Sequence, residues 1–570
     1  MLFLACVLQA ACVAPQDAWQ ARSTPSGATP TRPISTSTQL AATPVAGAMT
    51  PTPTRALTRV AGELHIAVRE NIRSLNPYVA ENDSEAFVVS LLYDTLLEQS
   101  PQGELTPNLA QRWESTGDGL SFSFWLNSVA EWHDGQPVTA QDVVFSFELA
   151  RHYQLPGLAH IVAWVDRVEA VNPGEVKFLL LAPRADALRL LATQLYIVPA
   201  SRWRDVDDPA SYANLEAPIG SGPFLFVKWV EEEQLVLRNA ASHHVFAPSV
   251  DALVVEILRN EDRALEALQE GQLDALGWDA NPSAVRRVQD NPDEYSGVRW
   301  LEVPGERTEA LLFNLRRAPY DNAAFRQALA RAVDTYTIVQ EVAAGFGDVA
   351  MGGLFPPAST WRSTRLAPIP FAALQAVKDL DVAGFVDRDD DGFREQPDGA
   401  ALSVAITCSD LPAAQSIAER VAANWGAVGI SAQVQPIAQD MMVPTLISAT
   451  FEVVLTEVSL AEPEMAYFYL HSSRGVLNHN GVSGLNYGGY ANPEFDELVR
   501  LAQRELDPQT RQVLLEDLQQ ILTTDLPLIS LYHPSVLSLY RDDHFSGWSG
   551  VPGRGILSRA VIAALTTSQQ

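Results

Sequence analysis

The segment of residues 132–146, Trp-His-Asp-Gly-Gln-Pro-Val-Thr-Ala-Gln-Asp-Val-Val-Phe-Ser, constrains the fold of this chain more than any other. An aromatic residue leads into His133-Asp134-Gly135, which carries an Asp-Gly turn signal, and an apolar helix face follows. Thr139 is the expected helix cap, with Gln141 in acceptor range within the first turn. The segment therefore predicts a strand end, a tight turn and a capped helix. On this pattern alone, the segment is expected to have a structural role.

Strand and helix patterns alternate along the rest of the chain. Apolar alternation or continuous apolar runs predict strands at 62–68, 120–126 and 176–181. Helical spacing predicts helices at 84–97, 263–271 and 321–345, the last capped by Asp321. A strand at 402–407, a helix ended by Gly429 and a strand at 430–434 form a βαβ unit, which requires a parallel sheet. The fold class is therefore α/β, built of several lobes.

Composition excludes several classes of function. The chain has 570 residues, 47% of them apolar, and 39 basic against 69 acidic residues give a net charge of -30. Such an acidic excess argues against a nucleic-acid partner. The lysines are Lys177, Lys228 and Lys378, and none is followed by Ser or Thr, so a Walker A loop is excluded. No G-x-S-x-G or H-E-x-x-H motif is present, which argues against two common kinds of secreted hydrolase.

The N-terminal region indicates an extracytoplasmic address. Residues 1–12 are mostly apolar and end at Cys12 after Ala10-Ala11, which predicts a lipoprotein signal with Cys12 as the acylated residue. Residues 13–59, rich in Ser, Thr and Pro, are then a tether. An ordinary cleaved signal peptide is the alternative. The apolar run is too short for a transmembrane helix, and Cys408 has no disulfide partner in the mature chain.

Several motifs together resemble one protein family. The 132–146 segment is similar to the "HDG-x-P-[LV]-T-A-x-DV" pattern of the family 5 extracellular solute-binding proteins, the peptide and nickel receptors of ABC importers. Further segments match family patterns in family order, from about residue 60 to about residue 545. They lie at 92–97, 106–113, 219–224, 265–274, 313–334 and 486–498.

This resemblance implies a two-lobed periplasmic-binding-protein-like fold (type II) with an extra subdomain in lobe I. Carried onto this chain, lobe I takes residues 60–94, 196–300 and 525–560, the extra subdomain takes 95–195, and lobe II takes 301–524. A hinge closes the lobes on a peptide or similar-sized organic solute and presents it to a permease. The resemblance implies no bond chemistry and no required cofactor. The expected partners are an ABC permease with its ATPase and the outer face of the membrane, with the protein a monomer.

The expected ligand site departs from the peptide-binding pattern. In peptide-binding members an aspartate in "W-x-x-DY-x-[DE]-P" holds the ligand's ammonium, and the tryptophan walls a side-chain pocket. Counted from Glu462-Pro463, this chain has Ser459 at the aspartate position and Thr456 at the tryptophan position. Either Glu457 or Glu464 takes over the charge, or the ligand lacks a free amine. The predicted ligand-binding residues are Thr456, Glu457, Ser459 and Glu462, although Glu462 serves equally as a helix-start carboxylate. Free-amine di- and tripeptides are expected to bind weakly.

An acidic segment and two histidine pairs are candidate metal ligands. Asp387, Asp389 and Asp391 before Gly392 match the first half of a calcium loop, with Asp398 at position 12. This predicts a structural calcium ion, and an acidic surface turn is the alternative. His243-His244, and His471 with His479, have no third ligand at a suitable spacing, so they are interpreted as ordinary core or surface histidines.

Two other functions remain open from the sequence. The first is a solute sensor or chaperone-like binding protein that works without a permease. The second is a secreted hydrolase on an unrelated α/β scaffold. Neighbouring permease genes would separate the receptor from the sensor, and a panel of hydrolase substrates would test the enzyme.

Overall fold

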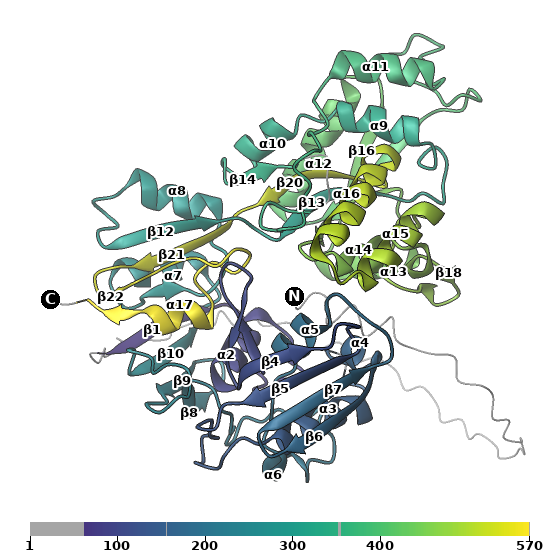
Figure 1. Cartoon of the computed structure of the whole chain (residues 1–570). Helices are drawn as coiled ribbons and strands as arrows, with labels where there is room; N and C mark the ends of the chain where they lie inside the picture. The colour runs from purple at the N-terminus through teal and green to yellow at the C-terminus, as the bar shows by residue number, and fades with distance from the viewer. Residues whose placement is uncertain (1–61, 156, 351–354, 569–570) are drawn as a thin grey trace, which may run out of the picture.

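The computed structural model describes residues 62–155, 157–350 and 355–568, which fold into two lobes (Figure 1). Lobe I contains a sheet in the order β12-β21-β11-β1-β10-β9-β8. Its strands are β1 (Glu63–Val68), β8 (Phe224–Val230), β9 (Gln234–Asn239), β10 (Ala252–Ile257), β11 (Ala275–Leu276), β12 (Val298–Val303) and β21 (Val536–Arg541). Two pairs of helices cover its two faces. They are α2 (Asp83–Leu92) with α17 (Arg559–Ala564), and α7 (Glu261–Gln269) with α8 (Pro282–Asp290).

The extra subdomain contains a second sheet, in the order β4-β5-β7-β6. Its strands are β4 (Ala110–Ser115), β5 (Ser121–Leu126), β6 (Val165–Asn172) and β7 (Glu175–Leu180), preceded by the hairpin of β2 (Leu97–Gln99) and β3 (Leu105–Pro107). Its helices are α3 (Ala140–His152), α4 (Ala159–Val162) and α5 (Ala187–Thr193), and α6 (Ala200–Trp203) packs on α3. The buried residues of this subdomain and of lobe I form one continuous apolar cluster. We therefore expect the two to move together.

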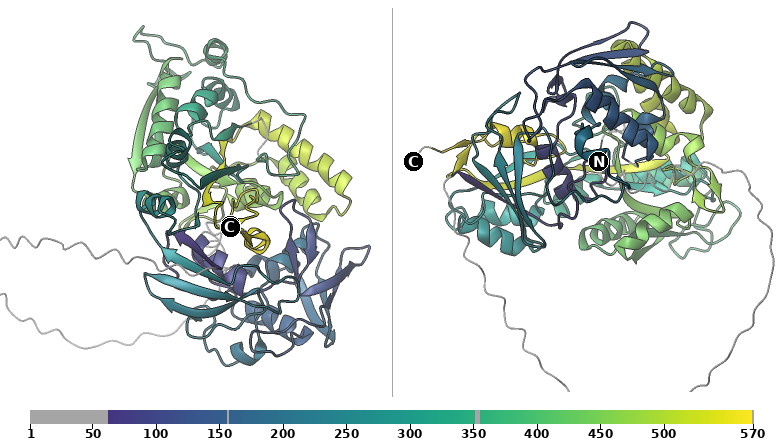
Figure 2. Two further views of the ribbon diagram at one scale, coloured as in Figure 1. Left: turned by 90° about the vertical axis from the view of Figure 1, so that its left-hand side faces the viewer. Right: turned by 90° about the horizontal axis from the view of Figure 1, so that it is seen from below.

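Lobe II contains a third sheet, in the order β14-β20-β13-β17-β15-β16. Its strands are β13 (Arg307–Phe313), β14 (Gly347–Val349), β15 (Ser403–Ser409), β16 (Ser431–Ile437), β17 (Val453–Ser459) and β20 (Leu528–Pro534). One face is covered by α9 (Ala323–Arg331), α10 (Thr335–Glu341), α11 (Ala373–Val382) and α12 (Pro412–Gly426). The other face is covered by α13 (Met442–Ser448), α14 (Glu464–Leu470), α15 (Pro493–Arg504) and α16 (Pro508–Asp525). Figure 2 shows the same division into lobes from the side and from below.

The α/β class and the predicted βαβ unit are confirmed. β15 pairs in parallel with β16 across α12, and Gly429 adopts a φ of 83° after the helix, a conformation that glycine reaches without strain. One domain boundary is wrong. The prediction assigns residues 525–560 to lobe I, but β20 hydrogen-bonds to β13 and β14 and so belongs to the sheet of lobe II.

Three local predictions need correction. The partner of Thr139 is Asp142, whose carboxylate accepts from the Thr139 backbone N–H at 3.0 Å, and not Gln141. The helix predicted at 84–97 ends at Leu92 because the following residues turn into β2. The helix predicted at 321–345 is capped by Asn322 and divides into α9 and α10, since the Asp334 side chain accepts from Thr337 N–H and starts a new helix.

His133 joins the extra subdomain to lobe I. Its Nε2 donates to the Gly222 carbonyl at 3.0 Å, and its Nδ1 accepts from Gly220 N–H at 3.2 Å. A Cβ at Gly220 would lie 1.8 Å from the Leu92 carbonyl oxygen, so only glycine fits there. Burial lowers the pKa of His133, which suits a neutral ring with one donor and one acceptor. The motif that identifies the scaffold is therefore structural.

Within the described residues, no helix combines the length and apolar character that a membrane crossing needs. Cys408 is buried in lobe II as a free thiol. The predicted signal at 1–12, its Cys12 and the tether up to residue 59 lie outside the described residues.

Candidate functional site

Two adjacent chain segments connect the lobes. One runs from the end of β12 at Val303 to the start of β13 at Arg307, and the other links β20 to β21 through Ser535. They lie against each other, because a Cβ on Gly305 would come within 2.0 Å of the Pro534 carbonyl oxygen. Figure 1 shows both connections passing through the narrow waist of the molecule. Two closely packed segments that connect two lobes, each with its own sheet and core, form an arrangement typical of a hinge.

The predicted ligand residues on β17 divide between the two faces of the lobe II sheet. Successive side chains of a strand point to opposite faces. Thr456 shares its face with Val454 and Val458, which pack under α13 to α16. Glu457 and Ser459 therefore lie on the opposite face, together with Leu455. The predicted ligand residues of β17 thus form two neighbouring groups, one on each face of the sheet.

Glu457 belongs to a cluster of charged side chains at the hinge, here named the cleft cluster: Asp279, Arg307, Glu309 and Glu457. Glu309 on β13 stands directly opposite Glu457 in the antiparallel pair. The Arg307 guanidinium lies 3.3 Å from the Glu457 carboxylate and 3.3 Å from that of Asp279. Asp279 comes from lobe I, where it also accepts from Leu537 N–H at 2.8 Å. The cleft cluster therefore spans the two lobes.

The cleft cluster carries more negative than positive groups. Burial and, next, the charge of Glu457 raise the pKa of Glu309 to about 8. Burial also raises the pKa of Asp279 to about 6, against the Leu537 hydrogen bond and the charge of Arg307. The side chains of Arg307 and Glu457 stay about half-exposed, at 47% and 46%. Asp279 and Glu457 thus share one accessible guanidinium, and Glu309 is mostly uncharged at neutral pH. The ionised groups of the cluster still carry an excess negative charge, which favours a positively charged ligand group.

Glu462 and Glu464 form a second contact between the lobes. Arg511 of lobe II donates to the buried Glu464 carboxylate, and Arg189 on α5 of the extra subdomain lies 3.4 Å from it and 3.5 Å from Glu462. Burial raises the pKa of Glu462 despite the charge of Arg189. Nearby, Ala185 N–H donates to the Gln503 carbonyl at 2.9 Å. Glu464 is therefore committed to two arginines.

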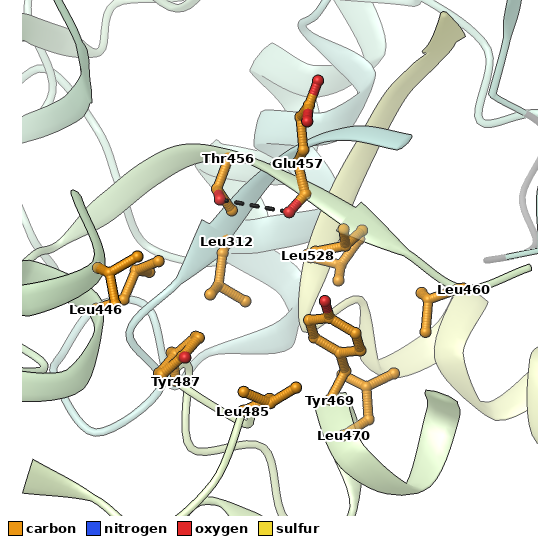
Figure 3. A pocket seen from close by; sticks show the side chains of 12 residues that line it. Leu312, Leu446, Thr456, Glu457, Leu460, Tyr469, Leu470, Leu485, Tyr487 and Leu528 are labelled. Atoms are coloured by element: carbon orange, nitrogen blue, oxygen red, sulfur yellow. Dashed lines mark hydrogen bonds between the residues drawn. The ribbon is translucent and has the colours of Figure 1, made fainter. Parts of the chain in front are cut away.

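A cavity of about 50 Å³ lies in lobe II beneath Thr456. Its walls are mostly apolar, and its leucines are Leu312, Leu446, Leu460, Leu470, Leu485 and Leu528. These leucines are buried, whereas Thr456, Val443 and Tyr469 are partly exposed and form the mouth. Figure 3 shows Thr456 at the cavity edge and the Glu457 carboxylate pointing away from it.

The acidic loop of lobe II gathers a slightly different set of carboxylates from the one predicted. Asp387, Asp389 and Asp391 do come together, with ligand atoms within 4.8 Å of one another, but the fourth member is Glu395. Asp398 accepts from Ala400 N–H in its own turn and is not among the four carboxyl groups that the structure brings together, so its role at position 12 stays a prediction. The loop carboxylates also accept backbone hydrogen bonds, as Asp387 does from Gly392 at 2.9 Å. Calcium binding stays a prediction.

The His243-His244 pair has a third neighbour that the sequence did not reveal. Asp94 lies 3.4 Å from His243 and 3.9 Å from His244, and all three are close enough to share an ion. Arg559 on α17, however, already pairs with Asp94 and lies 3.4 Å from His243 Nε2. The guanidinium thus supplies the positive charge that a metal would otherwise bring. We name Asp94, His243, His244 and Arg559 the lobe I cluster.

Comparison with known proteins shows which proteins this chain resembles. Residues 104–476 match the family model described as bacterial extracellular solute-binding proteins, family 5. The chain is 24% identical to the dipeptide-binding protein of Escherichia coli over 79% of this chain and 85% of that protein. It is also 24% identical to heme-binding protein A of Haemophilus influenzae, over 78% and 81% of the two chains.

Solved structures share the same two-lobed architecture. Oligopeptide-binding protein AppA of Bacillus subtilis, in complex with a nonapeptide, superimposes with a TM-score of 0.71 at 21% identity, over 89% of this chain and 99% of that one. NikA of Brucella suis, in complex with Fe(III)-EDTA, gives a TM-score of 0.77 at 21% identity, over 89% and 100%. These likenesses confirm the predicted fold. Because the named ligands differ so widely, they do not identify the cargo.

Proposed function

Because this chain belongs to the bacterial extracellular solute-binding proteins of family 5, we propose that it is the receptor of an ABC importer. It captures a peptide or similar-sized organic solute between its lobes and delivers the closed complex to a permease. The observation that carries the proposal is the cleft cluster, in which Asp279 of lobe I meets Glu457 of lobe II beside a packed hinge. A ligand group bound there contacts both lobes, so its binding energy favours closure.

The charge balance of the cleft supports a positively charged ligand group. Of the two carboxylates that could replace the missing aspartate, Glu464 is occupied by Arg511 and Arg189. Glu457 shares a single, half-exposed arginine with Asp279. A cationic group placed beside Glu457 and Asp279 would offset the repulsion between their carboxylates, and it would favour ionisation of Glu309, whose pKa is raised. We therefore assign the charge role to Glu457, with Ser459 on the same face of β17, and treat Glu462 as a residue of the interlobe contact.

A calorimetric comparison tests this assignment. A mixture of free-amine di- and tripeptides is titrated into the protein beside the same mixture after N-acetylation. If Glu457 holds the ammonium, acetylation weakens binding and Glu457→Gln removes the difference. If the ligand lacks a free amine, the acetylated mixture binds better. Glu419→Gln on the exposed surface of α12 is the matched control. Tight binding that no substitution at 456, 457 or 459 changes would refute the site.

Native mass spectrometry tests the receptor function without a choice of probe. Protein purified under mild conditions is expected to carry a co-purified solute that is released on denaturation. The expected solute carries a positive charge at neutral pH. Absence of any solute, together with no binding of either peptide mixture, would contradict the proposal.

The membrane partners follow from the same function. We propose that Cys12 carries the lipid anchor and that residues 13–59 tether the receptor, as a monomer, to the outer face of the membrane near its permease. Mass spectrometry of the N-terminal peptide from a Cys12→Ser variant and from the unchanged protein tests this. The lipid mass should be present only on the unchanged protein.

A further inference from the structure

The cavity beneath Thr456 is lined entirely by residues of lobe II, near the contacts that this lobe makes with lobe I and with the extra subdomain. On one side of its mouth, Glu457 reaches lobe I through Arg307 and Asp279. On the other side, Tyr469 belongs to α14, whose first residue Glu464 bonds to Arg189 of the extra subdomain. The mouth is therefore bracketed by both interlobe contacts. A solute held between the lobes would therefore lie beside the mouth of the cavity.

Thr456 leaves this cavity open. The family pattern has tryptophan at this position, whereas the short threonine side chain only reaches the neighbouring carbonyl, with Oγ1 3.5 Å from the Glu457 oxygen. Below it lie the six leucines and Val458, and the polar residues among those that line the cavity are Thr456, Glu457, Tyr469 and Tyr487. An apolar recess of this kind gains little from holding water.

We infer that the cavity beneath Thr456 is a specificity pocket for a short aliphatic group of the captured solute. This rests on the proposed receptor function and adds the chemical class of one ligand group. Apolar cavities of roughly 150 Å³ accept benzene, so a volume of about 50 Å³ fits two or three carbon atoms and excludes an aromatic ring. The ligand thus presents a cationic group to Glu457 on one face of β17 and a small branched or linear alkyl group to the cavity on the other face, along the part of the strand that β15 does not pair.

The pocket itself can be tested without knowing the cargo. Crystals pressurised with xenon are expected to show a bound atom among the six leucines. Thr456→Trp should remove that atom by filling the recess, and Val443→Phe should do the same from α13. Thr450→Trp, at an exposed position outside the pocket, is the control and should keep it. No xenon in the unchanged protein would overturn the inference.

The selectivity is tested with the tripeptides Ala-X-Ala, where X is glycine, alanine, valine or phenylalanine. Each buried methylene strengthens binding about fourfold, so valine should bind at least about tenfold more tightly than glycine, and phenylalanine no better than alanine. In Thr456→Trp and Val443→Phe the valine preference should fall to within about twofold. An unchanged preference in both variants would overturn the inference. If no tripeptide binds the unchanged protein, capture of peptides fails, and the xenon result alone decides the pocket.

Discussion

The lobe I cluster and the cleft cluster use the same kinds of side chain with opposite results. In the lobe I cluster, the side chains of Asp94 and Arg559 are 0% and 7% exposed, and they pair directly. Burial opposes ionisation of Asp94, yet the charge of Arg559 and the His243 hydrogen bond hold its pKa well below the usual value. Burial lowers the pKa of His244 to about 4, so it adds no positive charge. Asp94 is therefore paired with a buried guanidinium, which also lies 3.5 Å from the Glu98 carboxylate.

The cleft cluster has no such buried ion pair. Its single arginine is half-exposed and shared between Asp279 and Glu457, and Glu309 stands opposite Glu457. Burial moves the carboxyl pKa upward there, whereas in the lobe I cluster the arginine moves it downward. The comparison indicates that burial of the ion pair and access to solvent distinguish a cluster that anchors the fold from one that we propose to hold a ligand. Residue type alone does not.

Removing the arginine of each cluster should have the largest and most unequal effects. Arg559→Met leaves Asp94 buried without its partner, which costs about 3 to 5 kcal/mol of unfolding free energy. Arg307→Met should cost less than about 1 kcal/mol, because half-exposed ion pairs contribute little. Urea denaturation followed by tryptophan fluorescence measures both. Equal losses would mean that the two clusters do not differ in the way proposed.

Removing one carboxylate of each cluster should separate affinity from stability. Glu457→Gln should weaken binding of a cationic solute about ten- to hundredfold, the value of one charge-assisted hydrogen bond, with little change in unfolding free energy. Asp94→Asn should lower the unfolding free energy and leave the affinity of the folded protein within about twofold. Calorimetry on both variants, with urea curves from the same preparations, measures this. A loss of affinity in Asp94→Asn would break the distinction.

The sequence predicted what depends on local pattern. Gly429 after an apolar helix face and the apolar run at 402–407 sufficed for the βαβ unit, which the structure confirms. Counting from Glu462-Pro463 also singled out Glu457 as a candidate ligand residue, which stays a prediction. Strand alternation would also have placed Thr456 and Glu457 on opposite faces of the sheet, but residues 453–459 are not among the predicted strands.

The partners of Glu457 could not be predicted, because they depend on register and on lobe packing. Glu309 lies 148 residues before Glu457 and meets it only through the pairing of β13 with β17. Asp279 reaches Arg307 only when the lobes are assembled. The same reason hid the ion pair of Arg559 with Asp94, which joins the two ends of lobe I. One local signal existed, since Arg307 and Glu309 alternate on the strand that enters lobe II.

The pH dependence of stability should have opposite signs in the two clusters. Glu309 has a folded pKa of about 8, above its usual 4.5, so the folded protein binds the proton more tightly. Its contribution to stability is full below pH 4.5 and is lost as the pH rises through 8. Asp94 has a lowered folded pKa, so its contribution is present above its usual 3.8 and is lost as the pH falls through the folded value.

Glu309→Gln therefore should flatten the loss of stability between pH 5 and 8. The expected change is about 1 to 2 kcal/mol, because one unit of pKa change corresponds to about 1.4 kcal/mol and solvent screens part of the change at this partly exposed site. Thermal unfolding across this pH range, with Glu419→Gln as the control, measures it. A steeper loss in Glu309→Gln would contradict the raised pKa.

The acidic loop extends the comparison to carboxylates that water already screens, so it should give the smallest effect. Asp387, Asp389 and Asp391 are exposed, and their mutual repulsion costs less than that of the cleft cluster. If calcium binds with an affinity near 1 mM, as weak extracellular sites do, adding about 1 mM calcium stabilises the protein by only about 0.4 kcal/mol. Calorimetric titration with calcium should detect this binding, and Asp389→Asn should remove it. An identical melting temperature in chelator and in excess calcium would leave the loop as a solvated turn, where an unbalanced charge neither anchors the fold nor holds a ligand.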